Sequence, residues 1–329
     1  MRYKILGRGG PRVSVLGLGL WQAGSRMWSW RSGVEDNVRR ALGYAIAYGI
    51  NFLDTAEIYG AGYSERILGR ILSDLWDADL IIASKLAGYR WTMGSLRRGV
   101  EGINRRLGRT VDLIQHHWPP PAYVGVCRVV RGLERVVKEG LAHYYGLSNY
   151  PARLLEKALE CTKSVEPVSN QIQYSLAYRA PEASLIPVMR EAGLSVIAWS
   201  PLAKGALAGA RGARAMAQRL DPVFRRASRD RVLLDAVRRV AERRRATMAQ
   251  VALAWLMHKG AIPIPGFRRV ERVKEYVGAV DLVLTASDLD ELDRASAKYV
   301  NRGVYTPLQG MRLLPGLVQM LMIKMMGGV

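Results

Sequence analysis

The segment NFLDTAEIYG, at residues 51–60, carries the pattern that is most informative about the fold. A short apolar run ends in Asp54, and Tyr59 follows five residues later. Two later segments repeat the design: LIIASK at 80–85 ends in Lys85, and VDLIQHHWP at 111–119 carries His117. A short apolar run bounded by polar residues is typical of a buried parallel strand. Because successive parallel strands of a barrel end at one mouth, these polar side chains are expected to meet there.

Strand and helix signals alternate on both sides of these segments. The strand-like runs are 15–19, 51–54, 80–84, 111–115, 142–147, 168–171, 195–199 and 261–264. The helix-like stretches are 35–48, 64–75, 94–107, 124–139, 151–160, 181–191, 230–243, 247–258, 270–277 and 286–297. This alternation predicts one α/β domain over residues 1–329, a (β/α)8 TIM barrel with extra C-terminal helices. Two β-prone runs around a Gly-Gly-Pro turn predict an N-terminal hairpin at 3–16. An open doubly wound sheet would need GxGxxG after its first strand, and GLGLWQ at 17–22 lacks that spacing.

Composition limits the remaining possibilities. The chain has 329 residues, 49% of them hydrophobic, and a net charge of +21. It shows no signal peptide and no apolar run of membrane-spanning length, so we expect a cytoplasmic protein without a membrane span. The arginines are scattered along helices and no nucleic-acid-binding motif accompanies them, so we expect no dedicated nucleic-acid partner. The two cysteines, Cys127 and Cys161, are expected to be reduced thiols, although intracellular proteins of hyperthermophiles are an exception to that rule. No zinc-type ligand spacing occurs, so no metal is expected.

The four polar residues form an acid–base set. A tyrosine hydroxyl is a weak acid, and a neighbouring ammonium such as that of Lys85 is expected to lower its pKa. Asp54 is suited to pair with Lys85, and His117 to donate a hydrogen bond to a substrate oxygen. A metal site built from His116 and His117 is the competing interpretation, but adjacent strand residues point to opposite faces. We therefore expect His116 to face the packing.

The order Asp54, Tyr59, Lys85, His117, within DTAEIYG, ASK and QHHWP, resembles the catalytic tetrad of the aldo-keto reductases. The resemblance runs from residue 17 to about residue 285. It implies reversible hydride transfer from NADPH to an aldehyde or ketone, with Tyr59 as the general acid. The same superfamily contains the potassium-channel β subunits. The resemblance therefore also implies an alternative function, that of a cofactor-binding sensor or regulatory subunit with little turnover.

The resemblance also implies the cofactor seat. GLSNY at 146–150 and Gln171 match the segments that hold the nicotinamide carboxamide, and Trp199 matches the aromatic residue that stacks on the ring. The guanidinium groups of Arg268 and Arg272, at the start of the predicted helix 270–277, suit the 2′-phosphate of NADP. This favours NADP over NAD. The family commonly has Glu-Asn where this chain has Glu275-Tyr276, so amide contacts from an Asn to adenine are in doubt, although Tyr276 could stack on the adenine ring. The expected cofactor-binding residues are Trp21, Ser148, Asn149, Gln171, Trp199, Ser200, Pro201, Leu202, Gly205, Gly266, Arg268, Arg272, Glu275 and Tyr276.

Three features concern the substrate and the edges of the fold. Trp21, Trp91 and Trp118 are expected to line a pocket for a small carbonyl compound. The basic segment 204–229 is expected to be a long loop that covers the cofactor. The apolar tail 311–329 should start a helix near residue 317. It could pack on its own barrel, join a second subunit or touch a membrane, so a monomer and a homo-oligomer both stay open.

Overall fold

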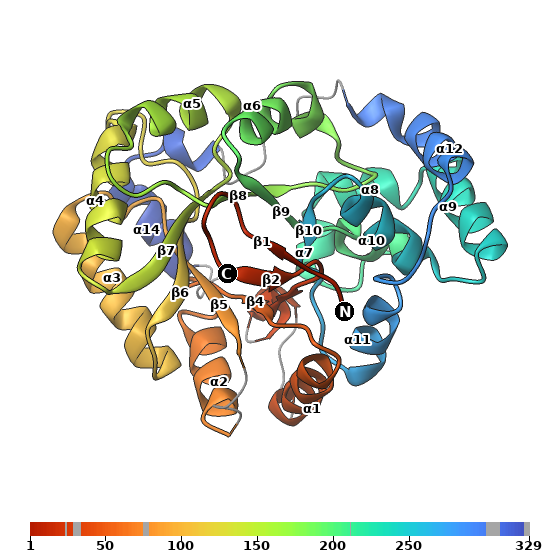
Figure 1. Cartoon of the computed structure of the whole chain (residues 1–329), viewed down its shortest axis with the longest axis horizontal. Helices are drawn as coiled ribbons and strands as arrows, with labels where there is room; N and C mark the ends of the chain where they lie inside the picture. Colours follow the sequence, from red (N-terminus) through yellow and green to blue (C-terminus); the bar gives the residue numbers. More distant parts are fainter. Residues whose placement is uncertain (24, 29–33, 75–78, 211, 301–309, 326–329) are drawn as a thin grey trace.

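Eight parallel strands form the barrel predicted from the sequence. The structure is a computed structural model that describes residues 1–23, 25–28, 34–74, 79–210, 212–300 and 310–325. The strands pair in chain order from β3 to β10. A parallel bridge between Gly19 and Gly266 joins the first strand to the segment after the last one and closes the barrel (Figure 1). The strands are β3 (Leu18–Gly19), β4 (Phe52–Asp54), β5 (Ile81–Leu86), β6 (Val111–His116), β7 (Ala142–Ser148), β8 (Ser169–Gln173), β9 (Ser195–Trp199) and β10 (Ile262–Pro263).

Helices surround the barrel, as the alternation of signals predicts (Figure 1). Local caps fix several of their starts: Thr247, for example, accepts a hydrogen bond from the Gln250 backbone N–H at 3.2 Å. The helices are α1 (Val34–Ala47), α2 (Tyr63–Leu72), α3 (Met93–Leu107), α4 (Val126–Lys138), α5 (Ala152–Cys161), α6 (Leu185–Glu191), α7 (Met216–Arg219), α8 (Pro222–Ala227), α9 (Arg231–Arg243), α10 (Met248–His258), α11 (Val270–Val277), α12 (Ala286–Ser296) and α14 (Gly316–Met325).

The N-terminal hairpin closes one end of the barrel. Strands β1 (Tyr3–Ile5) and β2 (Arg12–Ser14) pair antiparallel and lie across the barrel end nearest the viewer in Figure 1. Leu6 and Val13 are fully buried, and they pack with inward side chains of the barrel such as Phe52, Leu113 and Ile197. This end is therefore filled with apolar side chains, and polar chemistry is confined to the opposite end.

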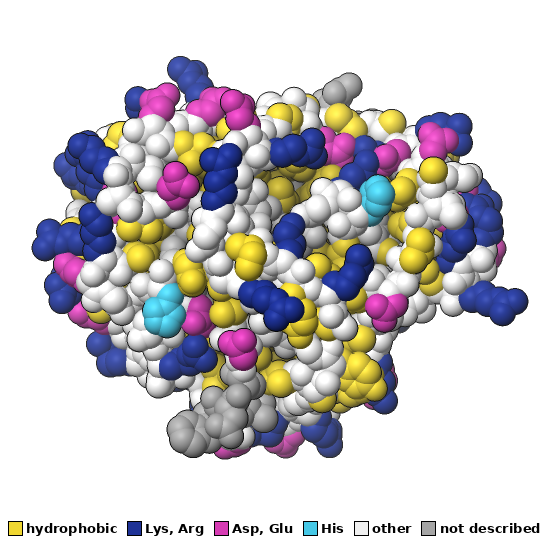
Figure 2. Space-filling view, viewed as in Figure 1, with side chains coloured by type: hydrophobic (Ala, Val, Ile, Leu, Met, Phe, Trp, Pro, Cys, Tyr) yellow, Lys and Arg dark blue, Asp and Glu magenta, His cyan; other side chains and the backbone are white. Residues whose placement is uncertain are grey.

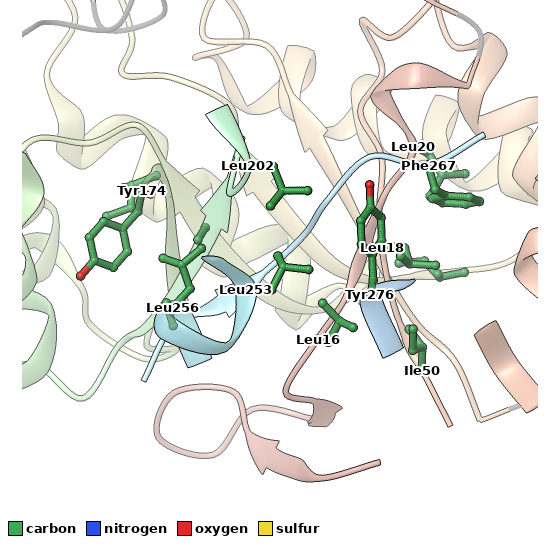
Figure 3. Packing of buried hydrophobic residues seen from close by; sticks show 14 of the residues in the cluster. Leu16, Leu18, Leu20, Ile50, Tyr174, Leu202, Leu253, Leu256, Phe267 and Tyr276 are labelled. Atoms are coloured by element: carbon green, nitrogen blue, oxygen red, sulfur yellow. The ribbon is translucent and has the colours of Figure 1, made fainter. Parts of the chain in front are cut away.

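The outer face of the sheet packs on the surrounding helices. Leu16, Leu18 and Leu20, in and beside β3, are fully buried. They belong to one large apolar cluster with side chains of α10 and α11, including Leu253 and Tyr276 (Figure 3). Burial of such apolar surface contributes roughly 25 cal/mol per Å² and holds the helices against the strands.

The segment 204–229 is not the long loop that we expected. It contains a 3-10 helix (Ala203–Ala208) followed by α7 and α8. Asp221 caps α8 by accepting the Phe224 backbone N–H at 2.7 Å, and Pro222 occupies the first turn. Asp-Pro is a helix-start signal, which the basic and glycine-rich composition of the segment masked. Lys204 forms an ion pair with Asp221, which ties the start of the segment to α8.

The apolar tail packs on its own barrel, which was one of the three arrangements left open. Helix α14 begins at Gly316, close to the predicted start. Gln319 and Ile323 are buried against the barrel, whereas Leu313 and Leu317 are 78% and 64% exposed. The tail thus has a buried inner face and an exposed apolar outer face. Residues 326–329 lie outside the described part of the chain.

The prediction of two reduced thiols is wrong. Cys127 of α4 and Cys161 of α5 form a disulfide, with their Cα atoms 5.1 Å apart. The two cysteines are separated by 34 positions in the sequence. The sequence separation of the two cysteines does not predict the bond, because only the packing of α4 against α5 brings the two sulfur atoms together.

Positively charged side chains are scattered over the face of the molecule that Figure 2 shows. On the face shown in Figure 2, lysine and arginine side chains alternate with acidic ones and do not gather into one patch. Within the described residues, no helix is both long enough and apolar enough to cross a membrane.

Candidate active site

Asp54, Lys85 and Tyr59 meet at the carboxyl ends of β4 and β5. The Lys85 side chain is completely buried and forms an ion pair with Asp54. Its ammonium also donates to the Thr55 carbonyl at 2.8 Å and to the Tyr59 hydroxyl at 3.3 Å. Removing one partner of such a pair leaves an uncompensated buried charge, so the arrangement is sensitive to substitution.

A layer of amides holds Asp54 from the other side. Gln115 donates to Asp54 Oδ1 at 3.2 Å, and Gln171 donates to the same oxygen at 2.6 Å. Gln171 also donates to the side-chain oxygen Oε1 of Gln115 at 3.2 Å. The three residues come from β4, β6 and β8, and alternate strands of a barrel contribute to one interior layer. Because the amides occupy Oδ1, Oδ2 is left for Lys85.

Burial dominates the proton affinities of Tyr59 and Lys85. Burial, and then the charge of Asp54, raises the pKa of Tyr59 well above its usual value. The expectation that Lys85 lowers the pKa of Tyr59 is therefore wrong. Lys85 is paired with Asp54, and the burial of the phenol outweighs the effect of the Lys85 charge on that pKa. Burial also lowers the pKa of Lys85, although Asp54 opposes that shift. In this arrangement Tyr59 holds its proton.

His117 is fixed through its backbone and presents a neutral ring. Its N–H donates to the Leu86 carbonyl at 2.8 Å, and its own carbonyl accepts from the Asn149 amide at 2.9 Å. Burial, and then the charge of Lys85, holds the pKa of His117 well below its usual range. Its ring centroid lies 5.8 Å from that of Tyr59. The buried Nδ1 atom has no hydrogen-bond partner within the described part of the protein.

His116 faces the packing, as expected from strand alternation. Its Nδ1 shares a hydrogen bond with the Tyr150 hydroxyl at 2.8 Å, and its Nε2 lies 3.1 Å from the Arg90 carbonyl. Burial lowers the pKa of His116 to about 4. His116 is therefore a neutral, satisfied core residue.

The residues expected to hold a nicotinamide form one cluster at the ends of β7, β8 and β9. Ser148 donates to the Gln171 carbonyl at 3.0 Å, and the Asn149 amide donates to the Ser148 hydroxyl at 3.1 Å. The Trp199 indole N–H donates to Asn149 Oδ1 at 3.0 Å. Asn149 takes a left-handed backbone conformation, with φ 60°. This cluster adjoins the tetrad directly, because Gln171 also bonds Asp54.

The chain turns sharply after β9. Ser200, Ala203 and Lys204 have φ values of 50°, 46° and 54°, and Gly205 follows with φ 103°. Left-handed residues among right-handed ones turn successive backbone N–H groups toward a common point, a geometry that suits anions. Pro201 and Leu202 are buried within this turn. The expected cofactor residues of this segment therefore lie in a compact loop beside Trp199.

The residues expected at the adenosine end lie just before α11 and along it. Arg268 is half-buried, donates to the Trp28 carbonyl and stacks over the Trp28 ring. Arg272 is exposed and forms an ion pair with Glu275 at 2.8 Å. Tyr276 is 4% exposed and donates to the Gly266 carbonyl at 3.1 Å. The Tyr276 ring thus belongs to the core, and a role in stacking on adenine has no support from its position (Figure 3).

The three tryptophans suggested for the substrate lie in different surroundings. The Trp21 ring centroid is 6.3 Å from that of Tyr59. Trp91 borders a cavity of about 270 Å³ that Tyr123 and Arg128 also line. Trp118 is completely buried, and its indole N–H donates to Gln319 at 2.9 Å. That N–H is consequently not free to bind a substrate.

Three residues around the site were not predicted from the sequence: Gln115, Trp28 and Gln319. Gln115 precedes His117 by two positions, so strand periodicity alone indicates that both side chains share one face. No local signal points to Gln319, since it lies 201 residues from its partner Trp118.

Comparison with known sequences identifies the family. A sequence profile described as "Aldo/keto reductase family" matches residues 15–297. The chain belongs to the aldo/keto reductase family. It is accordingly an oxidoreductase of that family, and the predicted resemblance is confirmed.

Individual members of the aldo/keto reductase family match over most of their length. An uncharacterized oxidoreductase of Mycobacterium tuberculosis is 35% identical over 300 residues, covering 88% of this chain and 91% of the relative. The chloroplastic pyridoxal reductase of Arabidopsis thaliana is 31% identical over 315 residues, covering 86% and 83%. The crystal structure of an aldo/keto reductase from Klebsiella pneumoniae, in complex with NADP and acetate, is 27% identical. It superposes with a TM-score of 0.76 and covers 94% of this chain and 99% of that one.

Proposed function

We propose that this aldo/keto reductase transfers a hydride from NADPH to the carbonyl carbon of an aldehyde or ketone, with Tyr59 as the general acid. The observation that carries the proposal is the position of the Tyr59 hydroxyl, 3.3 Å from the buried Lys85 ammonium and beside a neutral His117. A carbonyl oxygen that gains negative charge during reduction needs such a proton donor and a second hydrogen-bond donor.

The proton chemistry follows from the contacts. Tyr59 gives its hydroxyl proton to the carbonyl oxygen as the carbon–oxygen double bond becomes single. Lys85 stabilises the phenolate that remains, because its ammonium already donates to that oxygen. Asp54 keeps Lys85 in place, and His117 donates a ring N–H to the carbonyl oxygen and stays neutral. In oxidation of an alcohol the same groups act in reverse.

The residues fit a dinucleotide, which supplies the hydride. Ser148, Asn149 and Gln171 offer donors and acceptors of the kind that a carboxamide requires, and they are buried beside the tetrad. Gln171 already donates to Asp54, so its side-chain oxygen is the atom available to a carboxamide. Trp199 supplies a flat aromatic face. Arg268 and Arg272 are suited to bind the 2′-phosphate of NADPH. A phosphate at Arg272 would compete with Glu275, which forms an ion pair with that arginine.

The relatives support these assignments at the level of the family. The Klebsiella pneumoniae structure contains NADP, and the Arabidopsis thaliana relative is named for pyridoxal, an aromatic aldehyde. The surroundings of Tyr59 and His117 are rich in aromatic and apolar side chains, including Trp21, Trp118 and Ile58. We therefore favour apolar or aromatic carbonyl compounds as the substrate class.

A carbonyl screen tests the proposal. Purified protein is incubated with NADPH or NADH and a panel of aliphatic and aromatic aldehydes and ketones, and the loss of reduced nicotinamide absorbance is followed. We expect steady turnover of some carbonyls with NADPH and weaker turnover with NADH. Turnover that persists at the same rate in Tyr59→Phe would remove Tyr59 from the proposed role.

The second candidate is a cofactor-binding sensor or regulatory subunit with little turnover. The raised pKa of Tyr59 is the observation that favours it, because a more tightly held proton is harder to transfer. Tight NADPH binding without turnover of any carbonyl in the panel would select this candidate.

A further inference from the structure

The outer face of helix α14 is a stripe of exposed apolar side chains. Positions 317, 318, 321 and 322 are one and four residues apart, so they lie together along one side of the helix. The only charged residue of α14 is Lys324. Soluble proteins rarely expose so many large apolar side chains together without a binding role. The exposed apolar residues in and beside α14 are Leu313, Leu317, Val318, Leu321, Met322 and Met325.

Contacts on the inner face hold α14 in this orientation. Gln319 and Ile323 are buried, and the Gln319 side-chain oxygen accepts the Trp118 indole N–H at 2.9 Å. The backbone of the segment before α14 is fastened as well, because the Ala122 N–H donates to the Arg312 carbonyl at 2.8 Å. The helix cannot turn its apolar stripe inward without breaking these bonds, so the stripe is a fixed outer surface.

Two aromatic side chains lie at the start of α14. The Gly316 N–H donates to the Tyr123 hydroxyl at 3.3 Å, and a Cβ atom added at Gly316 would lie 3.7 Å from Trp91 Nε1. The Arg128 guanidinium lies over the Trp91 ring, 5.4 Å from its centroid. Tyrosine and tryptophan favour the boundary between the apolar interior of a bilayer and its polar headgroups. The aromatic pair thus connects the apolar stripe to an arginine of α4.

That arginine begins a basic ridge along α4. The ridge consists of four exposed side chains with helical spacing: Arg128, Arg131, Arg135 and Lys138. Arg135 forms an ion pair with Glu139 at 2.8 Å, and within the described residues the other three form none. The Glu134 carboxylate points away from the ridge, since it is buried and accepts the backbone N–H groups of residues 163–165. The sequence has no acidic residue at 113–133 or at 294–329.

Charge decides which partner fits this surface. The chain has a net charge of +21, so two copies repel each other, and a contact between two such surfaces would bring their basic ridges close together. An anionic bilayer attracts the ridge and accepts the apolar stripe at the level where headgroups meet acyl chains. An apolar face beside clustered arginine and lysine is the composition of helices that lie in a membrane surface.

We propose that the outer face of α14 and the basic ridge of α4 dock this protein on an anionic lipid bilayer. The stripe inserts below the headgroups, Tyr123 and Trp91 lie among the headgroups, and the ridge faces their phosphates. Helix α14 lies along the surface, because ten residues are too few to cross a bilayer. The inference goes beyond the proposed function and does not depend on it, since none of these residues belongs to the tetrad.

Vesicle sedimentation tests the docking surface. The protein is mixed with vesicles of phosphatidylcholine and phosphatidylglycerol in equal parts, or of phosphatidylcholine alone, at low and at high salt. The double variant Leu317→Ser/Leu321→Ser removes the stripe, and the double variant Arg128→Gln/Arg131→Gln removes half of the ridge. Matched controls use side chains that are equally exposed but lie away from α14: Val232→Ser/Val283→Ser for apolar surface and Arg225→Gln/Arg231→Gln for net charge.

We expect the wild type to bind the phosphatidylglycerol vesicles and to bind phosphatidylcholine alone far more weakly. Leu317→Ser/Leu321→Ser should weaken binding at least about thirtyfold, because two large apolar side chains no longer insert. Arg128→Gln/Arg131→Gln should weaken it about ten- to thirtyfold at low salt, and less at high salt, where the charges are screened. Both controls should stay within about twofold of the wild type, and all four variants should keep the wild-type Tm because the replaced side chains are exposed.

Three results would overturn the inference. The first is a wild type that does not sediment with phosphatidylglycerol vesicles. The second is a loss of binding in the control pairs as large as in the α14 and α4 pairs, which would reduce the effect to overall charge. The third is a wild-type dimer, seen by light scattering, that Leu317→Ser/Leu321→Ser converts to monomers, because a second copy would then cover the stripe. Carbonyl reduction is assayed without vesicles, so none of these results bears on the proposed function.

Discussion

Breaking the Cys127–Cys161 disulfide should lower the stability of the protein measurably. The perturbation is the double variant Cys127→Ser/Cys161→Ser, or treatment of the wild type with a reductant. The bond closes a loop of 34 positions between α4 and α5. In the chain-entropy description, a cross-link over that length removes unfolded-state freedom equivalent to about 4 kcal/mol at room temperature.

The size of the expected shift in melting temperature follows from chain length. With 329 residues and about 2 cal/mol/K of unfolding entropy per residue, the unfolding entropy is roughly 0.7 kcal/mol/K. A loss of about 4 kcal/mol then lowers Tm by about 6 °C. Scanning calorimetry at one fixed scan rate, with and without reductant, measures this shift.

Two controls separate the bond from other effects. Reductant should not change the Tm of the double variant, because it has no bond to break. Alkylation of the unreduced, denatured wild type, read by mass spectrometry, should leave both cysteines unmodified. Alkylation of both thiols would show that the bond is absent, and a Tm shift below about 1 °C in reductant would refute the loop-entropy reasoning.

The remaining predictions concern the site. Tyr59→Phe should lower kcat by about 10²–10⁴-fold and leave NADPH affinity nearly unchanged, since it removes the proton donor and little volume; a near-normal kcat would exclude general-acid catalysis by Tyr59. Because burial raises the pKa of Tyr59, its hydroxyl keeps its proton, and kcat for reduction should not fall between about pH 7 and pH 9. A loss of kcat centred near about pH 8 would contradict the raised pKa. Arg268→Ala and Arg272→Ala should each weaken NADPH binding by roughly ten- to a hundredfold and spare NADH, whereas the exposed Arg269→Ala should change neither; equal losses for both cofactors would remove the 2′-phosphate assignment. NADPH should slow tryptic cleavage within residues 204–229, a segment whose first residue, Lys204, lies over the Trp21 ring. Cleavage that NADPH does not affect would argue against a covering role.

The catalytic candidates were predictable because their signals are local. Asp54 and Lys85 each stand at or near the end of a short apolar strand, and His117 directly follows one. The chemistry of a phenol, an ammonium and an imidazole is evident from residue type. The orientation of His116 followed from strand alternation for the same reason.

The pKa of Tyr59 needed the folded protein. The sequence indicates a neighbouring ammonium, which favours the phenolate, but it gives neither the burial of the phenol nor the pairing of Lys85 with Asp54. Burial and the Asp54 charge reversed the expected direction. A pKa depends on the sum of such terms, and sequence patterns report only which groups are present.

The barrel, the order of its strands and the four residues at its mouth could be predicted from the sequence, since periodicity and strand ends are properties of short segments. The pairing of distant groups could not be predicted in this way: Gln319 bonds Trp118 across 201 residues, Cys127 bonds Cys161, and Gln171 bonds Asp54. Each of these contacts depends on how separate strands and helices pack around the barrel. No short segment contains that information, because an amide or a thiol at a helix position has the same local signal whichever neighbour it meets.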